Sequence, residues 1–154
     1  MLYYCEIALS NLEVPNETSL CIYISGCLNN CANCHYPELK SPDYGDILKD
    51  NYYQILTLYM NYANCVCFMG EGRNTEAEQK ELSEYSAIAH SYGLKTCLYS
   101  GRNTDIEKWM ETFDYVKTGR YMPEKGPINT PQTNQRMYKK CGFKYIDITS
   151  LFWN

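Results

Sequence analysis

Residues 20–26 of the chain read LCIYISG, an apolar and aromatic run that ends in a glycine. Side chains of this kind suit a pleated, buried surface, so the run predicts a buried β-strand. Three later runs have the same character: CVCFM at 65–69, LKTCLY at 94–99 and DYVKT at 114–118. The sequence therefore predicts four short strands separated by segments that can hold helices.

The segments between these strands carry helical patterns. Apolar residues recur at helical spacing over 46–62, which predicts an amphipathic helix. Thr75 and Glu78 stand three residues apart, as in a capping box, and predict a second helix that ends near Gly93. The same signal predicts a short helix over 104–113. The residues expected to face the core are Leu48, Tyr52, Ile55, Leu56 and Tyr59 in the first helix and Leu82, Tyr85, Ile88 and Tyr92 in the second.

Strands that alternate with helices across short turns predict an α/β fold with right-handed βαβ units and a mostly parallel sheet. The length of 154 residues fits a single domain, residues 1–154. An irregular stretch is expected at 122–136 and a last strand at 143–148. In parallel sheets, sites lie beyond the carboxyl ends of the strands. The turns expected there cover residues 26–34, 70–74, 100–103 and 119–123.

The composition is that of an ordinary globular protein, with 45% hydrophobic and 21% charged residues. The formal net charge is −4, so nucleic acid is not an expected partner. The sequence has no apolar run of about 18 residues, the length that would predict a membrane span. Residues 1–10 contain Glu6 and no Lys or Arg, unlike a signal peptide, and the expected location is therefore the cytoplasm.

Nine cysteines are unusual in such a chain. An odd number without a secretory signal favours thiol or metal chemistry over a disulfide framework. Three of them, Cys27, Cys31 and Cys34, form the spacing C-x3-C-x2-C in the turn after the first predicted strand. A turn lets three thiolates converge on one centre, so this motif is the expected functional site.

Two kinds of metal centre suit the motif. Structural zinc needs four ligands, and the fourth could be His35 or a thiol such as Cys65 or Cys67. A [4Fe-4S] cluster held by three thiolates leaves one iron open to a small molecule, as a catalytic site requires. Cys65, Cys67 and Cys97 are otherwise expected to pack as small buried hydrophobes.

The motif and its surroundings resemble one family. C-x3-C-x2-C after a short first strand is the signature of radical S-adenosylmethionine (SAM) enzymes. The stretch VPNETSLCIYISGCLNNCANCHYPEL, residues 14–39, resembles the activating enzymes of anaerobic (class III) ribonucleoside-triphosphate reductase. The resemblance covers nearly the whole chain and rests also on GE at 70–71, LYSG at 98–101, TNQR at 133–136 and YIDIT at 145–149.

This resemblance implies a short partial (βα) barrel of the radical SAM type and a glycyl-radical activating enzyme. In that family, S-adenosyl-L-methionine binds the open iron, and an electron from the reduced cluster cleaves its sulfonium–C5′ bond. The resulting 5′-deoxyadenosyl radical takes a hydrogen atom from a glycine of the reductase. The implied partners are the glycyl-radical subunit of that reductase and a flavodoxin or ferredoxin-type reductant.

By the same resemblance, Cys27, Cys31 and Cys34 hold the cluster. Asn33 and His35 flank the last ligand and are expected beside the cofactor. Many relatives have an aromatic residue where this chain has Asn33.

The other predicted cofactor-binding residues are Gly70, Glu71, Ser100 and Lys117. The family carries Gly-Gly-Glu or Gly-Gly-Asp at the first of these places, where the methionine amino group is received, and this chain replaces the first glycine by Met69. Ser100 leaves the third strand where a ribose could lie. Lys117 either meets the cofactor carboxylate or the partner's chain, or lies at a solvated strand end.

Three further interpretations concern the segment 133–136, the activity of the chain and hydrolysis. The segment 133–136 either docks the reductase and shapes the mouth of the site, or is the polar start of a terminal helix. The chain could activate another glycyl-radical enzyme of the formate-lyase type, although those activases are usually longer, or be a non-catalytic zinc-binding interaction module. Hydrolysis by a serine or cysteine nucleophile has little support, because neither His35 nor His90 has an evident partner in the sequence.

Overall fold

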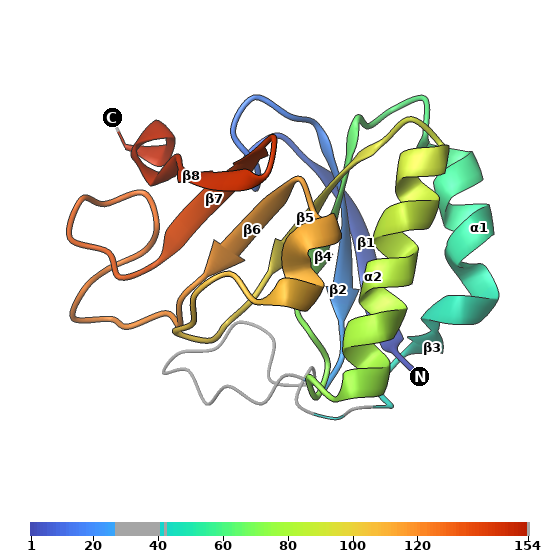
Figure 1. The fold of residues 1–154 in the computed structure, drawn as a ribbon. Helices are drawn as coiled ribbons and strands as arrows, with labels where there is room; N and C mark the ends of the chain where they lie inside the picture. Colours follow the sequence, from blue (N-terminus) through green and yellow to red (C-terminus); the bar gives the residue numbers. More distant parts are fainter. Residues whose placement is uncertain (27–40, 42, 154) are drawn as a thin grey trace.

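The computed structural model describes residues 1–26, 41 and 43–153. The elements of this part of the chain combine one sheet with two α-helices and a 3-10 helix on one side of it (Figure 1). In chain order they are β1 (Tyr3–Ser10), β2 (Ser19–Ile24), β3 (Asp46–Ile47), α1 (Leu48–Tyr59), β4 (Cys65–Met69), α2 (Glu76–Ser91), β5 (Lys95–Tyr99), the 3-10 helix η2 (Lys108–Thr112), β6 (Tyr115–Thr118), β7 (Arg136–Cys141), β8 (Lys144–Asp147) and the 3-10 helix η3 (Thr149–Phe152).

The sheet has the strand order β3-β1-β2-β4-β5-β6-β7-β8. Its central strands β2, β4, β5 and β6 are parallel neighbours, whereas the strands on both sides of them pair antiparallel. The α/β class is confirmed, but the expectation of a mostly parallel sheet is wrong. Antiparallel neighbours need no crossover helix, so β1 and β7 join the sheet without the helical spacing from which parallel strands were inferred.

Local patterns account for most of the central elements. The predicted strands at 20–25, 65–69, 94–99 and 114–118 correspond to β2, β4, β5 and β6. α2 begins with the predicted capping box, in which the Glu78 amide donates to the Thr75 hydroxyl at 3.2 Å. Its C-cap is followed by Gly93, whose φ of +77° is the left-handed conformation that glycine adopts most readily.

The helices bury the expected stripes, but three of the expected residues are less buried than the rest. In α1 the expected residues are buried except Tyr59, which is partly buried, and in α2 Ile88 and Tyr92 are also only partly buried. The helix predicted over 104–113 is a shorter 3-10 helix, Lys108–Thr112. The Thr104 hydroxyl donates to the Asp105 carbonyl instead of capping a helix.

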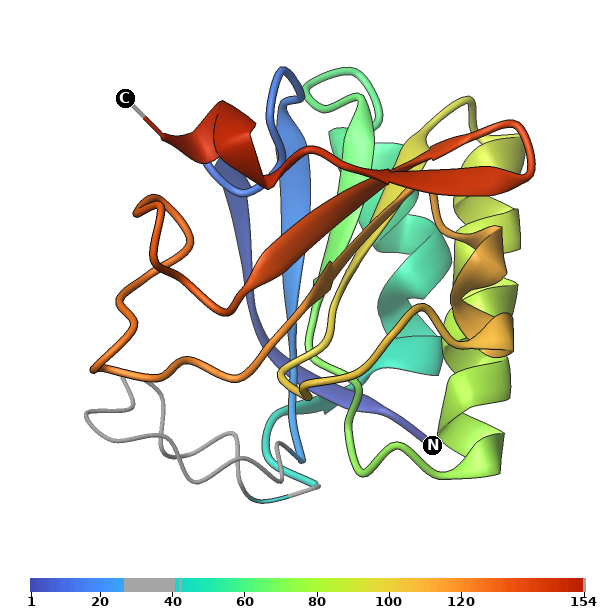
Figure 2. The same ribbon diagram turned by 60° about the vertical axis from the view of Figure 1, so that its left-hand side comes forward.

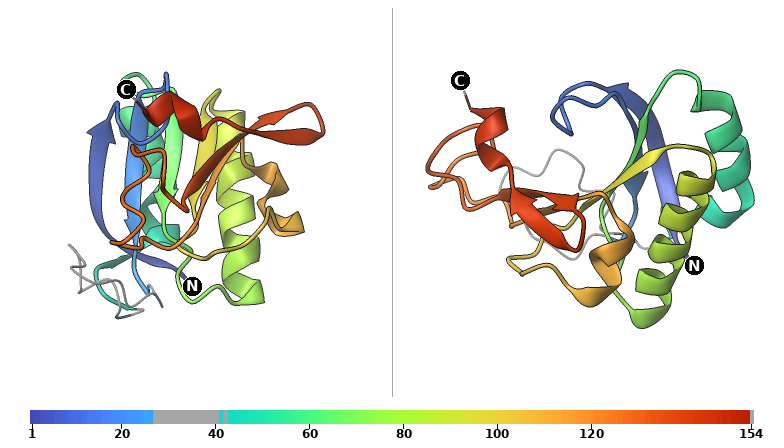
Figure 3. Two further views of the ribbon diagram at one scale, coloured as in Figure 1. Left: turned by 90° about the vertical axis from the view of Figure 1, so that its left-hand side faces the viewer. Right: turned by 45° about the horizontal axis from the view of Figure 1, so that its top comes forward.

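Each face of the sheet has its own core. α1, α2 and η2 cover one face (Figure 2). On this face Phe68 and Leu98 pack among helix residues such as Tyr52 and Leu82. On the other face a second cluster contains Val14, Cys21, Cys65, Cys67, Cys97, Tyr115 and Met137. The C-terminal chain passes over this second face (Figure 3), and Ile128, Ile148 and Phe152 pack against it.

Three strands have no counterpart among the predictions: β1, β7 and the short strand β3, whose residues fall within the helix predicted over 46–62. β1 pairs with β2 from residue 4 to residue 10, and β7 pairs with β6 from Arg136 onward. The alternative that 133–136 begins a terminal helix is therefore wrong. The predicted last strand at 143–148 is present as β8. Neither α-helix among the described residues has the length and apolar character needed to span a bilayer.

Candidate functional site

The carboxyl ends of the four parallel strands meet at one edge of the sheet, the lower edge in Figure 1. The loops after β4, β5 and β6 leave from this edge, and Gly26 follows β2 there. The predicted cluster ligands Cys27, Cys31 and Cys34 and their neighbours Asn33 and His35 lie outside the described residues. The rest of the predicted site can be followed residue by residue.

Gly70 directly follows β4 and has a φ of +126°. A Cβ at this position would lie 3.3 Å from the carbonyl oxygen of Ile24, the last residue of β2. Glycine is therefore favoured by the backbone conformation, and a side chain here would also make a tight contact with the end of β2. Met69, which stands in place of the family's first glycine, is the last residue of β4 and pairs in register with Tyr23 and Tyr99.

Glu71 is buried, with 6% of its side chain exposed, and its carboxylate is held by Arg102. The two nitrogens Nε and Nη2 of Arg102 donate to Oε2 and Oε1 of Glu71 at 2.8 and 3.1 Å. This bidentate pair neutralises the carboxylate and joins the loop after β4 to the loop after β5. Arg102 is not among the residues predicted from the sequence, because nothing in its local sequence indicates a partner 31 residues away.

A second carboxylate binds the same guanidinium. Nη1 and Nη2 of Arg102 donate to Oε2 and Oε1 of Glu107 at 3.0 and 2.7 Å. The hydrogen bond from Arg102 is the main cause that lowers the pKa of Glu107 to about 2, and the Trp109 indole, which donates at 2.8 Å, adds to it. The bonds to Glu107 and then to Glu71 raise the pKa of Arg102. Two carboxylates thus share one permanent cation.

Ser100 is buried directly after β5. Its amide donates to the Lys117 carbonyl at 2.7 Å, and its hydroxyl accepts from the Arg102 amide at 3.3 Å. The structure therefore brings the predicted site residues Ser100 and Lys117 together through their main chain. The hydroxyl of Ser100 already braces its own loop.

Lys117 is partly buried in β6, and its ammonium group lies 4.5 Å from the centre of the Tyr99 ring. A cation over an aromatic face is attracted by the negative potential of the ring. The Tyr99 hydroxyl in turn donates to the main-chain carbonyl of Glu13, in the segment that links β1 to β2. Lys117 is thus packed against an aromatic side chain rather than extended into solvent.

The segment 133–136 braces the loop after β6. Gln135 is buried, and its side-chain Nε2 donates to the Gly119 carbonyl at 3.3 Å. Asn134 donates to the Arg120 carbonyl at 2.9 Å and to the Asn103 side chain at 3.1 Å. These contacts connect the C-terminal chain to the loops after β5 and β6, at the edge where the site is predicted.

Three cysteine side chains lie side by side across the parallel strands, further inside the sheet than the strand ends. Cys21, Cys67 and Cys97 are paired in register on three adjacent parallel strands, and none is exposed to solvent. Burial raises the pKa of Cys67 and Cys97, and hydrogen bonding with Cys67 together with burial raises that of Cys21. Nucleophilic attack requires the thiolate, and buried thiols of this kind pack as small hydrophobic side chains.

Cys65, named as a source of a fourth zinc ligand, belongs to the same buried face. It is fully buried, and desolvation raises its pKa. Within residues 1–26, 41 and 43–153, no group of three or more His, Cys, Asp or Glu side chains is placed to hold a metal ion. The burial of Cys65, Cys67 and Cys97 is what the packing prediction requires.

The structure gives His90 a partner that is not evident in the sequence. Its Nε2 atom lies 2.8 Å from Oδ2 of Asp114 and 3.4 Å from the Thr96 hydroxyl. Both contacts use one ring nitrogen, whereas a nucleophile–base–acid relay needs the carboxylate and the hydroxyl on different nitrogens. The cluster therefore has the geometry of a hydrogen-bonded surface pair and gives no support to hydrolysis.

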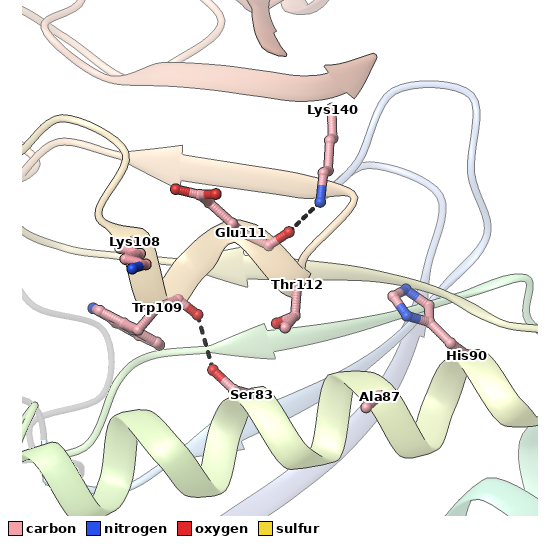
Figure 4. A pocket seen from close by; sticks show the side chains of 8 residues that line it. All are labelled: Ser83, Ala87, His90, Lys108, Trp109, Glu111, Thr112 and Lys140. Carbon is pink, nitrogen blue, oxygen red and sulfur yellow. Dashed lines mark hydrogen bonds between the residues drawn. The ribbon is translucent and has the colours of Figure 1, made fainter. Parts of the chain in front are cut away.

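A shallow pocket lies beside His90, between α2 and η2 (Figure 4). Within it the Ser83 hydroxyl donates to the Trp109 carbonyl at 2.8 Å, and Lys140 donates to the Glu111 carbonyl. These bonds fasten η2 and β7 to their neighbours. The lining residues include none of the predicted site residues: Ser83, Ala87, His90, Lys108, Trp109, Glu111, Thr112 and Lys140.

Comparisons with protein-family models, with curated proteins and with solved structures each found no match to this chain. The functional reading therefore rests on the residues and their arrangement.

Proposed function

We propose that this chain is a radical SAM oxidoreductase, the glycyl-radical activating enzyme of an anaerobic ribonucleoside-triphosphate reductase. One observation carries the proposal. The motif C-x3-C-x2-C begins at Cys27, directly after Gly26, and β2 ends at the same sheet edge as its parallel neighbours β4, β5 and β6. The segment that carries the thiol motif, the loops of Gly70, Glu71 and Ser100, and the end of β6 that holds Lys117 therefore all start or end at one edge.

The fold is compatible with this proposal. Four adjacent parallel strands with α1, α2 and η2 on one face are, in our proposal, a shortened part of a (βα) barrel of the radical SAM type. The antiparallel strands β1, β3, β7 and β8 extend that unit on both sides. The strand order β2-β4-β5-β6 follows the chain order, as successive βα units require.

The available residues fit the cofactors in their chemistry. Three cysteine thiolates are the natural ligands of a [4Fe-4S] cluster and leave one iron for S-adenosyl-L-methionine. When bound and reduced, the cluster supplies the electron that cleaves the cofactor. Among the described residues, Gly70 lets the loop after β4 lie close to the end of β2, because glycine has no side chain. Lys117 contributes a positive charge suited to a carboxylate, and Arg102 keeps the Glu71 carboxylate neutralised.

The proposed partners follow from the same chemistry. A glycyl-radical subunit of the reductase would present its glycine to the loops at the carboxyl edge, and a flavodoxin or ferredoxin-type protein would supply the electron. The reaction belongs to the cytoplasm, where both partners would be found.

The test is an anaerobic assay. The protein is reconstituted with iron and sulfide and given S-adenosylmethionine and dithionite, and 5′-deoxyadenosine is measured by mass spectrometry. We expect product that disappears in Cys27→Ala, Cys31→Ala and Cys34→Ala but persists in Cys141→Ala, which removes an exposed thiol of the β7–β8 hairpin. Stoichiometric zinc without iron and without product would instead establish the zinc-binding module.

The partner is identified separately by electron paramagnetic resonance. The loaded protein is mixed with an anaerobic ribonucleoside-triphosphate reductase or with a formate-lyase-type enzyme, and the glycyl radical is quantified. A radical on the reductase alone supports the proposal. A radical on the formate-lyase-type enzyme alone would show that the chain activates that class.

A further inference from the structure

Arg102 connects the three loops that leave the carboxyl edge of the parallel strands. Its guanidinium binds Glu71 after β4, at 2.8 and 3.1 Å. Its main-chain carbonyl accepts from the Gly119 amide after β6 at 2.8 Å, and its own amide donates to the Ser100 hydroxyl after β5. A displacement of Arg102 would therefore change contacts in the loops after β4, β5 and β6.

The Glu71 end of this bridge is the most buried part of it. The side chain of Glu71 is 6% exposed, against 32% for Arg102 and 35% for Glu107. A carboxylate with so little access to water depends on its cation, whereas the more exposed Glu107 can be solvated. The planar guanidinium also matches both carboxylate oxygens at once, which an ammonium group cannot do.

Glu71 in turn holds the main chain of its loop. Its carbonyl accepts from the Asn74 amide at 3.1 Å, and Gly72 follows it with a φ of +63°. The loop 70–74 therefore forms a defined turn. Its one buried carboxylate, that of Glu71, is bound by Arg102, which lies outside this loop. Preorganised loops bind ligands more tightly because less ordering is required on binding.

We propose that Arg102 is a positioning residue for S-adenosylmethionine, which acts through Glu71 to hold the loop 70–74 in its binding conformation. This inference rests on the proposed function, in which that loop receives the methionine end of the cofactor. Arg102 itself is not assigned a contact with the cofactor. Its role is to fix the loop before the cofactor binds.

The first test measures the dissociation constant of S-adenosylmethionine by equilibrium dialysis, using anaerobic protein of matched iron content. We expect Arg102→Met to raise the dissociation constant by about tenfold or more, since small displacements of a positioning group have large effects. Arg102→Lys keeps the charge and loses the second hydrogen bond, and it should lie between Arg102→Met and wild type. The rate of 5′-deoxyadenosine formation at saturating cofactor should change by less than about twofold.

A double-mutant cycle tests the route through Glu71. If Arg102 acts only through this carboxylate, Arg102→Met should weaken binding much less in a Glu71→Gln background than in wild type. The double variant also removes the buried unpaired charge, so it remains informative if Arg102→Met alone folds poorly. Independent, multiplicative effects of the two substitutions would overturn the proposal.

Lys95→Met is a matched control. Lys95 also pairs with a buried carboxylate, since its ammonium lies 2.8 Å from Glu17, whose side chain is 4% exposed. This pair lies at the amino end of β5, opposite to the candidate site. Lys95→Met should lower stability without changing the dissociation constant, which separates positioning from a general loss of stability.

Hydrogen exchange gives a readout that does not depend on the cofactor. Without cofactor, Arg102→Met should speed amide exchange at Asn74 relative to wild type and to Lys95→Met. Equal cofactor affinity in wild type and Arg102→Met would overturn the positioning role, even if exchange changed. Failure of the iron-loaded wild type to bind S-adenosylmethionine would contradict the proposed function itself and this inference with it.

Discussion

The phenol of Tyr115, the first residue of β6, donates a 2.6 Å hydrogen bond to the carboxylate of Glu17, which lies 98 positions earlier in the chain. Burial and this bond raise the pKa of Tyr115, so the phenol stays protonated and able to donate. Lys95 completes the charge balance from β5. Glu17 thereby holds the segment between β1 and β2 against the sheet face that contains the buried cysteines. Val14, from the same segment, packs on this face.

Glu17→Leu is expected to destabilise the fold. It leaves the buried Tyr115 hydroxyl without its acceptor, which typically costs about 1–3 kcal/mol. Urea unfolding followed by circular dichroism would measure the loss. Glu84→Gln, on the exposed side of α2, should change stability by less than about 0.5 kcal/mol. Equal stabilities of Glu17→Leu and wild type would show that the bond contributes nothing.

Gly119→Ala should destabilise the protein more than Gly93→Ala. Both glycines have positive φ, +107° and +77°, so both substitutions incur backbone strain of about 1–2 kcal/mol. A Cβ at Gly119 would also lie 2.8 Å from the Cα of Gln135, whereas a Cβ at Gly93 would meet no atom within 4 Å. Thermal unfolding of the two variants gives the comparison, and a larger loss in Gly93→Ala would contradict the described packing of 133–136 on the loop.

The buried thiols should resist alkylation in the folded state. Cys141 is exposed and should react with iodoacetamide within minutes at pH 8, whereas Cys21, Cys65, Cys67 and Cys97 should react only after unfolding. Because these four cysteines are buried, the reagent cannot reach them, and their raised pKa values keep them as thiols. Mass spectrometry of digested protein identifies the modified sites, and fast labelling of Cys67 in folded protein would contradict its placement.

Cys67→Ala and Cys31→Ala should differ in the kind of defect they cause. Loss of the buried Cys67 side chain should lower stability by about 1 kcal/mol, as expected for a small core cavity, and leave cofactor cleavage largely intact. Cys31→Ala should abolish cleavage, because it removes a proposed cluster ligand. The measurement is 5′-deoxyadenosine formed by folded, anaerobically prepared protein, and equal losses in both variants would refute this division of roles.

The Glu107 pair should make stability depend on pH at acid values. The pKa of Glu107 is lowered to about 2 from its usual 4.5, so folding is favoured while the group is ionised. This contribution is fully present above about pH 4.5 and is lost as pH falls towards 2. The stability difference between wild type and Glu107→Gln should therefore shrink across that range. A difference that stays constant from pH 6 to pH 2.5 would contradict the ion pair.

Local sequence was sufficient to locate the central elements. β4 coincides with the apolar run 65–69, and α2 follows the capping box of Thr75 and Glu78. Such signals lie within a few residues of one another, so neighbouring side chains alone determine them. The cysteine motif is likewise a matter of spacing in the sequence, and the prediction that its three cysteines hold a cluster adds the family resemblance to that spacing.

What the tertiary structure decided is the pairing of residues that are distant in sequence. β1 and β7 owe their places to antiparallel partners, and the sheet is therefore mixed although the alternation of strands and helices predicted a mostly parallel one. Glu71 could be named from its motif, but its burial and its bidentate bond to Arg102 could not. The physical reason is that burial and charge pairing depend on which loops the folded sheet brings to one edge, and no local pattern encodes that.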